Sequence, residues 1–184
     1  ALEAALTDVA SLRIRVFRDY PYLYDGDEAY ERQYLGAYRD APGAIVVGAF
    51  DGSDLVGAST GTPLAHHDPA FGAPLTKAGF DVDEVFYCAE SVLLAPFRGQ
   101  GTGHQFFDIR EAYARELNLK YSAFCRVVRS DDDPRRPENF FPLDSFWKKR
   151  GYTPLPGAIA QFDWKEVGQD NDVTHDLQFW TRKL

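Results

Sequence analysis

The spacing of apolar residues changes several times along the chain, and each spacing predicts an element. In residues 1–20, Val9, Leu12, Val16 and Phe17 fall on one side of a helix. Helical spacing returns in three later segments, which are 27–38, 103–117 and 143–150. Strand-like runs occupy 44–50, 55–60, 85–94, 121–128, 159–167 and 174–184. We expect a loop with a short helix over 62–83, a polar insertion over 129–142, and an α/β fold.

Length and composition narrow the class of protein. A chain of 184 residues suits a single domain spanning 1–184, and its apolar content of 45% is ample for a packed core. The net charge of −8 and the lack of a lysine-rich run argue against nonspecific nucleic-acid binding. No run is long and apolar enough to span a bilayer and no signal peptide is visible, so we expect no membrane association.

Cysteine, histidine and methionine usage adds three further expectations. Cys88 and Cys125 lie in strand-like runs, which favours two buried thiols over a disulfide and fits a reducing cytoplasm. The pair His66-His67 has no second cluster of His and Cys to support a metal site, so we expect a loop surface there and no metal. The sequence has no methionine, even at its start, which is typical of a chain whose N-terminus has been trimmed.

A glycine-rich turn, Arg98-Gly99-Gln100-Gly101-Thr102-Gly103, separates the apolar run 85–94 from the helical segment 103–117. Such a turn exposes backbone N–H groups, and the helix dipole points the same way, so the turn is suited to hold phosphate. Arg98 adds a positive charge with forked donor geometry. A Walker-type loop would need Gly-Lys-Ser/Thr where Gly103-His104 stands, and a dinucleotide fingerprint would need a small residue at Phe106.

The turn instead resembles the Arg/Gln-x-x-Gly-x-Gly/Ala pyrophosphate loop of the GNAT superfamily of acyl-CoA-dependent N-acyltransferases, matched here as Arg98-x-x-Gly101-x-Gly103. The run 93–97 and the order of elements are also similar to that family. The resemblance implies a mixed, mostly antiparallel central sheet flanked by helices. It also implies one more strand before the first helix, which we do not find and expect to be absent or trimmed. An ordinary glycine turn is the alternative, but it leaves the order of three glycines and an arginine unexplained.

The resemblance implies acetyl-CoA as co-substrate. Backbone N–H groups of 100–103 would hold the pyrophosphate, and the pantetheine arm would pair like an added strand with the backbone of 92–94. The end of that strand could also donate an N–H to the thioester oxygen as the amine attacks. The residues expected to bind acetyl-CoA are Val92, Leu93, Leu94, Arg98, Gly99, Gln100, Gly101, Thr102, Gly103 and Trp147.

Glu90 is the candidate catalytic residue, because it interrupts an apolar strand where a carboxylate is costly unless it has a partner or a task. Strict alternation places it on the same face as Val92 and Leu94, barring a bulge. An amine substrate arrives protonated, so a partly buried carboxylate suits either removal of that proton or binding of the ammonium group. The alternative is a structural ion pair, for instance with Arg126. Ser91 is expected to face the other way in a structural role.

Three further residues are candidates for the site. Trp147 stands where the family's Leu-Tyr-x-x-x-Gly-Phe pattern has a tyrosine that protonates the leaving thiolate, and an indole cannot donate a proton near neutral pH. A water or another residue would have to replace it, or no acid is needed, and Trp147 then covers the pantetheine or the core. Arg126 and Arg129 could clamp a substrate carboxylate or phosphate, whereas a solvated, self-paired loop is the alternative.

The most favoured function is an N-acetyltransferase that moves an acetyl group from acetyl-CoA to a primary amine by direct attack in a ternary complex. The acceptor would be a small-molecule or peptide amine, and the protein a monomer or homodimer in the cytoplasm. One alternative is a GNAT-fold module that binds acyl-CoA as a sensor with reduced catalysis. A second is another phosphate binder, such as a nucleotide-binding protein. Tyrosines between Tyr20 and Tyr38 line an acceptor pocket or form a helix core.

Overall fold

The computed structural model of the protein describes residues 2–184, with side chains from residue 6 onward. The chain opens with two helices and a hairpin, which are α1 (Leu2–Phe17), α2 (Glu28–Asp40), β1 (Ile45–Asp51) and β2 (Asp54–Pro63). The middle holds α3 (Pro69–Lys77), β3 (Val85–Tyr87), β4 (Ser91–Leu93) and α4 (Thr102–Glu116). The last part holds β5 (Tyr121–Val127), α5 (Asp144–Lys149), β6 (Thr153–Lys165) and β7 (Asp172–Lys183).

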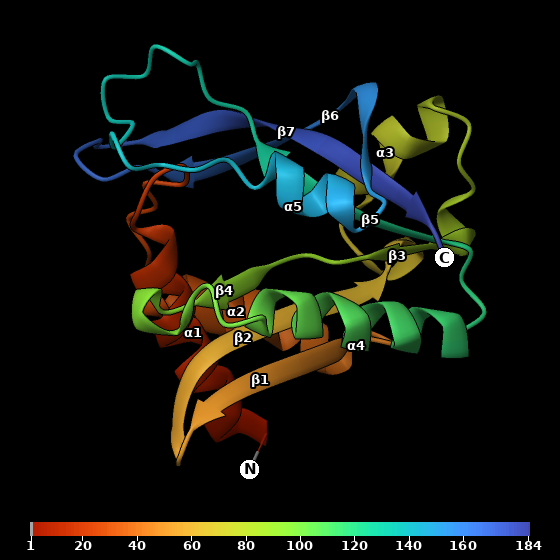
Figure 1. Ribbon diagram of the computed structural model, residues 1–184, viewed down its shortest axis with the longest axis horizontal. Coiled ribbons are helices and arrows are strands. Elements are labelled where there is room, and N and C mark those ends of the chain that lie inside the picture. The colour runs from red at the N-terminus through yellow and green to blue at the C-terminus, as the bar shows by residue number, and fades with distance from the viewer. Residues whose placement is uncertain (1) are drawn as a thin grey trace.

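The strands form one seven-stranded sheet in the order β1-β2-β3-β5-β7-β6, with β4 paired to β2 beyond β3 (Figure 1). Strands β3 and β5 run parallel, and the other neighbouring strands of the described chain pair antiparallel. The sheet is therefore mixed and mostly antiparallel, which confirms the predicted fold class. None of the helices among residues 2–184 has the length and apolarity needed to cross a membrane.

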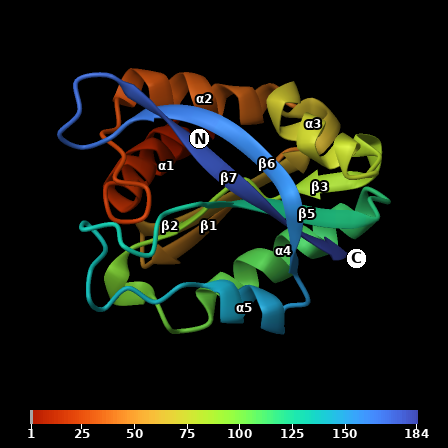
Figure 2. The same ribbon diagram turned by 90° about the horizontal axis from the view of Figure 1, so that it is seen from above.

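Helices cover both faces of the sheet, with α1, α2 and α3 on one side and α4 and α5 on the other (Figure 2). On the first side, Val9, Leu12 and Leu35 pack against Ala58 and Val92 of the sheet. On the second side, the apolar face of α4 packs through Phe107 and Ala114 against a cluster of sheet residues, which are Phe86, Cys88, Phe124 and Trp180. Burial of both helix layers fixes the sheet between them.

The apolar run 85–94 is not the continuous strand that its composition predicts. It is divided into β3 and β4 by a bulge in which both Ala89 and Glu90 oppose Thr60 of β2. The Ala89 N–H donates to the Thr60 carbonyl, and the Thr60 N–H donates to the Glu90 carbonyl, both at 3.1 Å. Because a bulge adds one residue, Tyr87, Ala89 and Glu90 all turn toward the same face as Val92.

The bulge also marks the place where two strands separate. Strand β3 pairs with β5 up to the bond from the Cys88 N–H to the Ala123 carbonyl, at 2.8 Å. Beyond it, β4 stays with β2, whereas β5 continues along β7. The edge of β4 that faces away from β2 is therefore not paired with β5. Both cysteines are free thiols, as predicted, with Cys88 buried and Cys125 half-buried.

Candidate functional site

The glycine-rich turn forms an open loop at the start of α4. Gly99 and Gly101 have φ angles of +77° and +89°, which other residues adopt only with strain. A methyl group added at either position would meet no atom within 4 Å, so both glycines border open space. Gly101 is the N-cap of α4, which begins at Thr102, one residue before the predicted start of the helix. The conformation explains why glycine is required at both positions.

The backbone N–H groups of this loop are available to a ligand. Hydrogen bonds resume with His104 and Gln105, whose N–H groups donate to the Gly101 carbonyl at 2.9 and 3.2 Å. Within the described chain, the N–H groups of residues 99–103 have no recorded acceptor. Five free donors at the positive end of a 15-residue helix are an arrangement suited to an anion. Arg98 is exposed beside them, with its Nε donating to the Leu93 carbonyl at 2.9 Å.

One edge of β4 is hydrogen-bonded to β2, and the other edge faces the gap between β4 and β5. The Leu94 N–H donates to the Val56 carbonyl at 2.9 Å, so by antiparallel alternation Val92 and Leu94 turn their main-chain groups toward β2. Ser91 and Leu93 turn theirs toward the gap. Of the three predicted pantetheine-pairing residues, the structure thus brings only Leu93 to the open edge. Ser91 joins it there, which the sequence did not indicate.

Trp147 lies on the α5 side of the sheet, packed against two rings of the core. Its ring centroid lies 4.9 Å from that of Phe124 and 5.2 Å from that of Trp180. The neighbouring Tyr152 is buried, and its hydroxyl donates to Glu111 and shares a second hydrogen bond with the Ser122 hydroxyl, so it belongs to a structural network. Trp147 is half-buried and its indole N–H has no recorded partner among the described residues. Its contacts are those of a packing residue.

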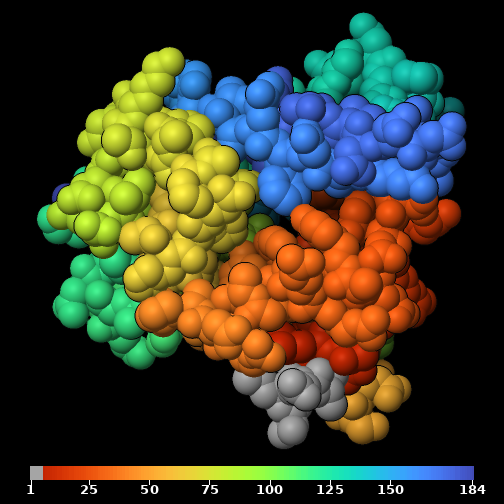
Figure 3. All heavy atoms as spheres, turned by 180° about the vertical axis from the view of Figure 1, so that it is seen from behind, coloured from red at the N-terminus to blue at the C-terminus, as the bar shows by residue number. Residues whose placement is uncertain are grey.

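A cavity of about 420 Å³ opens on the opposite face, between α1, α2, α3 and the sheet. Figure 3 shows its mouth as a hollow where α2 in orange, α3 in yellow and β6 in blue meet. Its walls are mostly aromatic side chains, contributed by Phe17, Tyr22, Tyr24, Tyr30, Tyr34, Tyr38, Phe71, Tyr87, Phe162 and Trp164. Five of the tyrosines from Tyr20 to Tyr38 therefore line a pocket. Tyr20 itself packs edge-to-face against Phe140.

Glu90 lies in this cavity as part of a buried charge cluster. Its Oε1 is 2.5 Å from Nη1 of Arg13, and its Oε2 accepts a hydrogen bond of 3.2 Å from the Tyr34 hydroxyl. The Nε of Arg13 donates to Oε2 of Glu31 at 2.5 Å. Arg13, Glu31 and Glu90 are each less than 9% exposed. The partner of Glu90 is thus Arg13 of α1, whereas the sequence suggested Arg126.

Arg13 and Glu90 form an ion pair, but no N–H bond of Nη1 points at Oε1 well enough to make a hydrogen bond. Oε1 of Glu90 consequently accepts no hydrogen bond from any described residue, although it is fully buried. A buried carboxylate oxygen with an unused acceptor position is costly unless a ligand or water donates to it. Among the described lining residues, Oγ1 of Thr62 and Nδ1 of His67 are also buried without a hydrogen-bond partner, but Oε1 of Glu90 belongs to the only carboxylate of the three.

Burial shifts the other titratable groups of the cavity toward their neutral forms. Burial, reinforced by the negative charge of Glu90, raises the pKa of Tyr34 well above its usual value and that of Tyr22 to about 12. Burial also lowers the pKa of His67 below 6.5, against the opposing effect of Glu90. His67 lines the cavity between the rings of Tyr38 and Tyr87, at centroid distances of 6.2 and 4.8 Å. Neutral imidazole and phenol groups thus surround the carboxylates.

Arg110 of α4 holds the bulge from the other face of the sheet. Its Nη1 donates to the carbonyls of Thr60 and Glu90 at 2.9 and 3.0 Å, and its Nη2 donates to the Ser91 hydroxyl at 2.7 Å. Arg110 is only 1% exposed. The helix that carries the anion loop at its start therefore also fixes the backbone of Glu90. Ser91 faces α4 in a structural role, as predicted.

The two arginines predicted to clamp a substrate anion lie outside the cavity. Nη1 of Arg126 pairs with Asp144 of α5 at 2.8 Å. Arg129 donates to the carbonyls of Pro21 and Tyr22, at 2.7 and 3.1 Å, and its Nη1 pairs with Glu166 at 2.6 Å. Neither is brought to Glu90. Both guanidinium groups are already paired with carboxylates of the protein itself.

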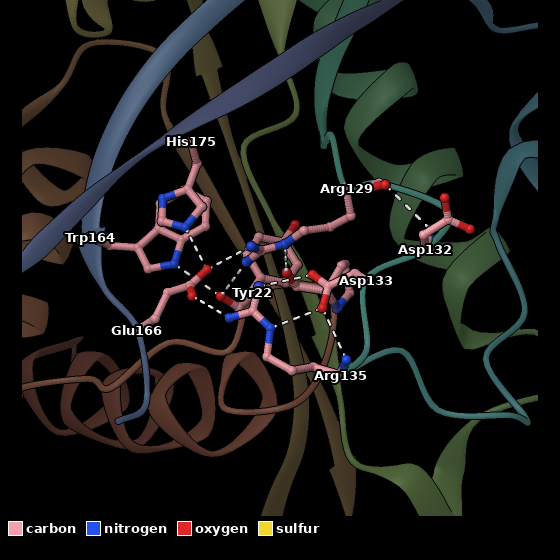
Figure 4. A network of polar contacts seen from close by, with 10 residues as sticks. Tyr22, Arg129, Asp132, Asp133, Arg135, Trp164, Glu166 and His175 are labelled. Atoms are coloured by element: carbon pink, nitrogen blue, oxygen red, sulfur yellow. Dashed lines mark hydrogen bonds and ion pairs between the residues drawn. The ribbon is translucent and has the colours of Figure 1, made fainter. Parts of the chain in front are cut away.

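Figure 4 shows the network around Glu166, which ties the insertion 129–142 and the loop after α1 to the end of β6. Glu166 is 3% exposed and contacts Arg129, Arg135 and His175. Trp164 stacks on His175 at a centroid distance of 3.5 Å and donates to the Tyr22 carbonyl at 3.0 Å. Because Trp164 and Tyr22 line the cavity, this network fixes one of its walls.

We expect Glu166→Gln to destabilise the protein at neutral pH but not in strong acid. Burial disfavours the charged form of Glu166, yet hydrogen bonds from His175, Arg135 and Arg129 outweigh it and lower its pKa to about 2. A pKa lowered in the folded state stabilises above the unfolded value of about 4.3, and this contribution is lost as the pH falls toward 2. Urea unfolding of both proteins from pH 7 to pH 2.5 measures it.

The difference in unfolding free energy between wild type and Glu166→Gln should shrink across that range. Glu138→Gln, which alters an exposed carboxylate of the same insertion, is the control and should change little at any pH. A difference that stays constant with pH would contradict the charge-based role of Glu166.

Solved structures resemble the chain over almost all of its length. A ribosomal-protein-alanine N-acetyltransferase from Brucella melitensis has a TM-score of 0.62 at 15% identity, covering 100% of this chain and 97% of its own. The protein yncA from Salmonella typhimurium, solved with its cofactor acetyl-CoA, has a TM-score of 0.63 at 12% identity, covering 100% and 91%. An acetyltransferase of the GNAT family from Staphylococcus aureus Mu50 has a TM-score of 0.59 at 13% identity, covering 99% and 92%.

The chain has the GNAT fold. At these identities the likeness establishes the fold and confirms that part of the prediction. No family model matches the sequence, and a comparison with curated proteins finds no significant match. The described part of this GNAT fold begins with α1, and the first strand of its sheet is β1. What the site does must therefore be argued from its own residues.

Sequence reasoning missed four side chains that shape this site. Arg13, Glu31 and Arg110 sit at helical positions where a charged residue is ordinarily solvated, so only the tertiary packing shows that they are buried. The sequence predicts a loop surface for His67. Its ring instead packs against rings from α2, α3 and β3, and these contacts between distant segments are not visible in the sequence. A signal was present in the sequence for Glu31, which follows the helical spacing of Tyr34 and Tyr38 on α2.

Proposed function

We propose that the protein transfers an acetyl group from acetyl-CoA to a primary amine by direct attack in a ternary complex. The observation that carries the proposal is the buried Oε1 of Glu90, which is ion-paired with Arg13 but accepts no hydrogen bond, and which lies at the bulge where β4 and β5 separate. An ammonium group supplies such a donor and a complementary charge. On the other side of the bulge, the open edge of β4 leads toward the anion loop at α4.

The residues present fit acetyl-CoA. The free N–H groups of residues 99–103 suit its pyrophosphate, and Gly99 and Gly101 leave room for the phosphates to approach. The main-chain groups of Ser91 and the N–H of Leu93, which face away from β2, suit the amides of the pantetheine arm, whereas the Leu93 carbonyl already accepts from Arg98. When bound, acetyl-CoA supplies an activated acetyl group, and the CoA thiolate is a fair leaving group. Placement by several backbone contacts lowers the entropy cost of reaction.

The protein's own groups then account for the protons. Glu90 anchors the ammonium group and accepts its proton, directly or through water, so that the nitrogen lone pair is free. The nitrogen forms the new C–N bond at the thioester carbon and loses its second proton to water, the C–S bond breaks with its electron pair on sulfur, and the thiolate takes up a proton. An N–H at the open edge of β4 stabilises the oxyanion between these steps. Trp147 supplies no proton, so we assign that last proton to water.

Release of free thiol tests the proposed function. Protein, acetyl-CoA and a panel of primary amines are mixed, and thiol is measured with a chromogenic disulfide while the acetylated amine is identified by mass spectrometry. We expect thiol release that depends on the amine. Thermal stabilisation by acetyl-CoA without thiol release for any amine would favour an acyl-CoA-binding module instead. Competition between ATP and CoA separates both from a nucleotide-binding protein.

We expect Gly101→Asp to abolish the rise in melting temperature that acetyl-CoA causes in the wild type. The rise follows from mass action, since a ligand that binds only the folded state stabilises it. An aspartate at φ +89° would be strained and would place a negative charge where phosphate must approach. Differential scanning fluorimetry with and without acetyl-CoA measures the shift.

Gly79→Asp is the matched control for strain, because Gly79 has a φ of +90° and open space around it but lies after α3. Gly79→Asp should lower the baseline melting temperature and keep the shift caused by acetyl-CoA. An undiminished shift in Gly101→Asp would show that the loop does not bind the co-substrate.

A further inference from the structure

The cavity that holds Glu90 has the composition of a site for a small organic cation. Its walls are aromatic from α1 to β6, and its volume of about 420 Å³ lies within the range of small-molecule sites. Aromatic faces attract cations through their quadrupole and also bury apolar surface. Tyr34 and Tyr87 keep neutral hydroxyls, because burial raises the pKa of each well above its usual value. Such walls favour a ligand whose body is apolar.

The charge of the cavity determines which polar groups that ligand can carry. Arg13, Glu31 and Glu90 together hold one positive and two negative charges, so the cluster has a net charge of −1. Arg13 is the only lysine or arginine among the residues that line the cavity in the described chain. A desolvated negative charge attracts an ammonium group and repels a carboxylate or phosphate.

Arg13 is already paired with two carboxylates, so its positive charge is neutralised before a ligand anion arrives. Its Nε and Nη2 donate to Glu31, at 2.5 and 3.5 Å, and its Nη1 contacts Glu90. The faces of its guanidinium group lie against two rings, at 4.4 Å from the centroid of Tyr34 and 5.1 Å from that of Phe17. A carboxylate on the acceptor would therefore lie beside two buried carboxylates, and no lysine or further arginine among the described lining residues could neutralise it.

We propose that the acceptor is a small primary amine with an aromatic or similarly bulky apolar body and no carboxylate near the nitrogen. The ammonium group lies on Oε1 of Glu90, and the body lies among the aromatic walls. This inference rests on the proposed function, because it names the acceptor of the same reaction. It excludes amino acids, whose α-carboxylate would stand beside Glu90.

Matched amines test the proposal in the acetyl-transfer assay. 2-Phenylethylamine and phenylalanine share the ring and the amine and differ by one carboxylate, whereas ethylamine lacks the ring. We expect kcat/KM for 2-phenylethylamine to exceed that for phenylalanine and that for ethylamine, each by about 10²-fold or more. An equal or higher kcat/KM for phenylalanine, or for a lysine-containing peptide, would overturn the inference while leaving the acetyltransferase function intact.

Direct binding keeps the two proposals distinguishable. Isothermal titration of 2-phenylethylamine into the protein without acetyl-CoA measures the site whether or not chemistry follows, and phenylalanine should not bind. Binding of 2-phenylethylamine without thiol release would support the cation site and contradict the acetyltransferase function. Thiol release with other amines but no binding of 2-phenylethylamine would contradict the cation site alone.

A wall variant locates the ligand. Phe162 of β6 lines the cavity and contacts Phe71 at a centroid distance of 5.8 Å. Phe162→Ala should raise KM for 2-phenylethylamine by about 10-fold and leave KM for acetyl-CoA unchanged. Phe141→Ala, which removes a ring that is 82% exposed in the insertion, should change neither constant. An unchanged amine KM in a folded Phe162→Ala protein would contradict the placement.

Discussion

Replacing Glu90 with glutamine should lower turnover by about 10²-fold or more, in line with the contribution of a general base, and leave acetyl-CoA affinity unchanged. Glutamine has the shape of glutamate but neither its charge nor its capacity to take the proton of an ammonium group. The fold should tolerate the change, because Arg13 keeps its bonds to Glu31 and the Tyr34 hydroxyl can still donate to the side-chain oxygen. Steady-state kinetics at saturating amine measure turnover, and calorimetric titration measures acetyl-CoA affinity.

Glu31→Gln is the matched control, since Glu31 contacts the same arginine from the other side. If Glu90 acted only by holding Arg13, both variants would lose similar turnover. We expect Glu31→Gln to retain most of its turnover at saturating amine. A Glu90→Gln protein that is less stable but fully active would show that Glu90 is a structural ion-pair partner of Arg13 and not a catalytic residue.

The parts of this site that the sequence predicts are those set by local conformation. Gly99 and Gly101 are required by positive φ angles, and a loop of that shape before a helix exposes backbone N–H groups that suit an anion. Glu90 stands out because an isolated carboxylate in an apolar run is costly wherever that run folds. Glu90 shares a face with Val92, as alternation predicts, because the regular alternation resumes at Glu90, the last residue of the bulge.

The parts that the sequence does not predict depend on contacts between distant segments. The bulge at Ala89 and Glu90 is held by Arg110, 20 residues away, and adds a residue that simple alternation cannot anticipate. Arg13 lies 77 positions before Glu90 on another helix, so their pairing is visible only in three dimensions. Arg126 and Arg129 seemed free in the sequence because Asp144 and Glu166, which hold them, come from later elements.

Replacing Arg13 with methionine should destabilise the protein by about 3–5 kcal/mol, which is the cost of breaking a buried ion pair from one side. Glu31 is fully buried and Glu90 is 8% exposed, so neither carboxylate can turn to solvent for a new partner. Methionine keeps much of the apolar stem of arginine, which makes the loss of charge the main change. Urea unfolding at pH 8 measures it. Arg18→Met is the control, because Arg18 pairs with Asp25 near the surface and should cost about 1 kcal/mol or less.

The pH dependence of this loss distinguishes stranded charge from lost packing. In folded Arg13→Met, protonation removes the unpaired negative charge of a buried carboxylate. The same carboxylates in the unfolded chain are solvated and hold no proton at that pH. Because the folded state then binds more protons, the stability of the variant rises as the pH falls, and its deficit against wild type should be smaller at pH 5 than at pH 8. Adding Glu31→Gln to the variant removes one stranded charge and should restore part of the loss at pH 8. A deficit that is the same at both pH values and unaffected by Glu31→Gln would mean that Arg13 stabilises the fold through its contacts with Phe17 and Tyr34 and not through its charge.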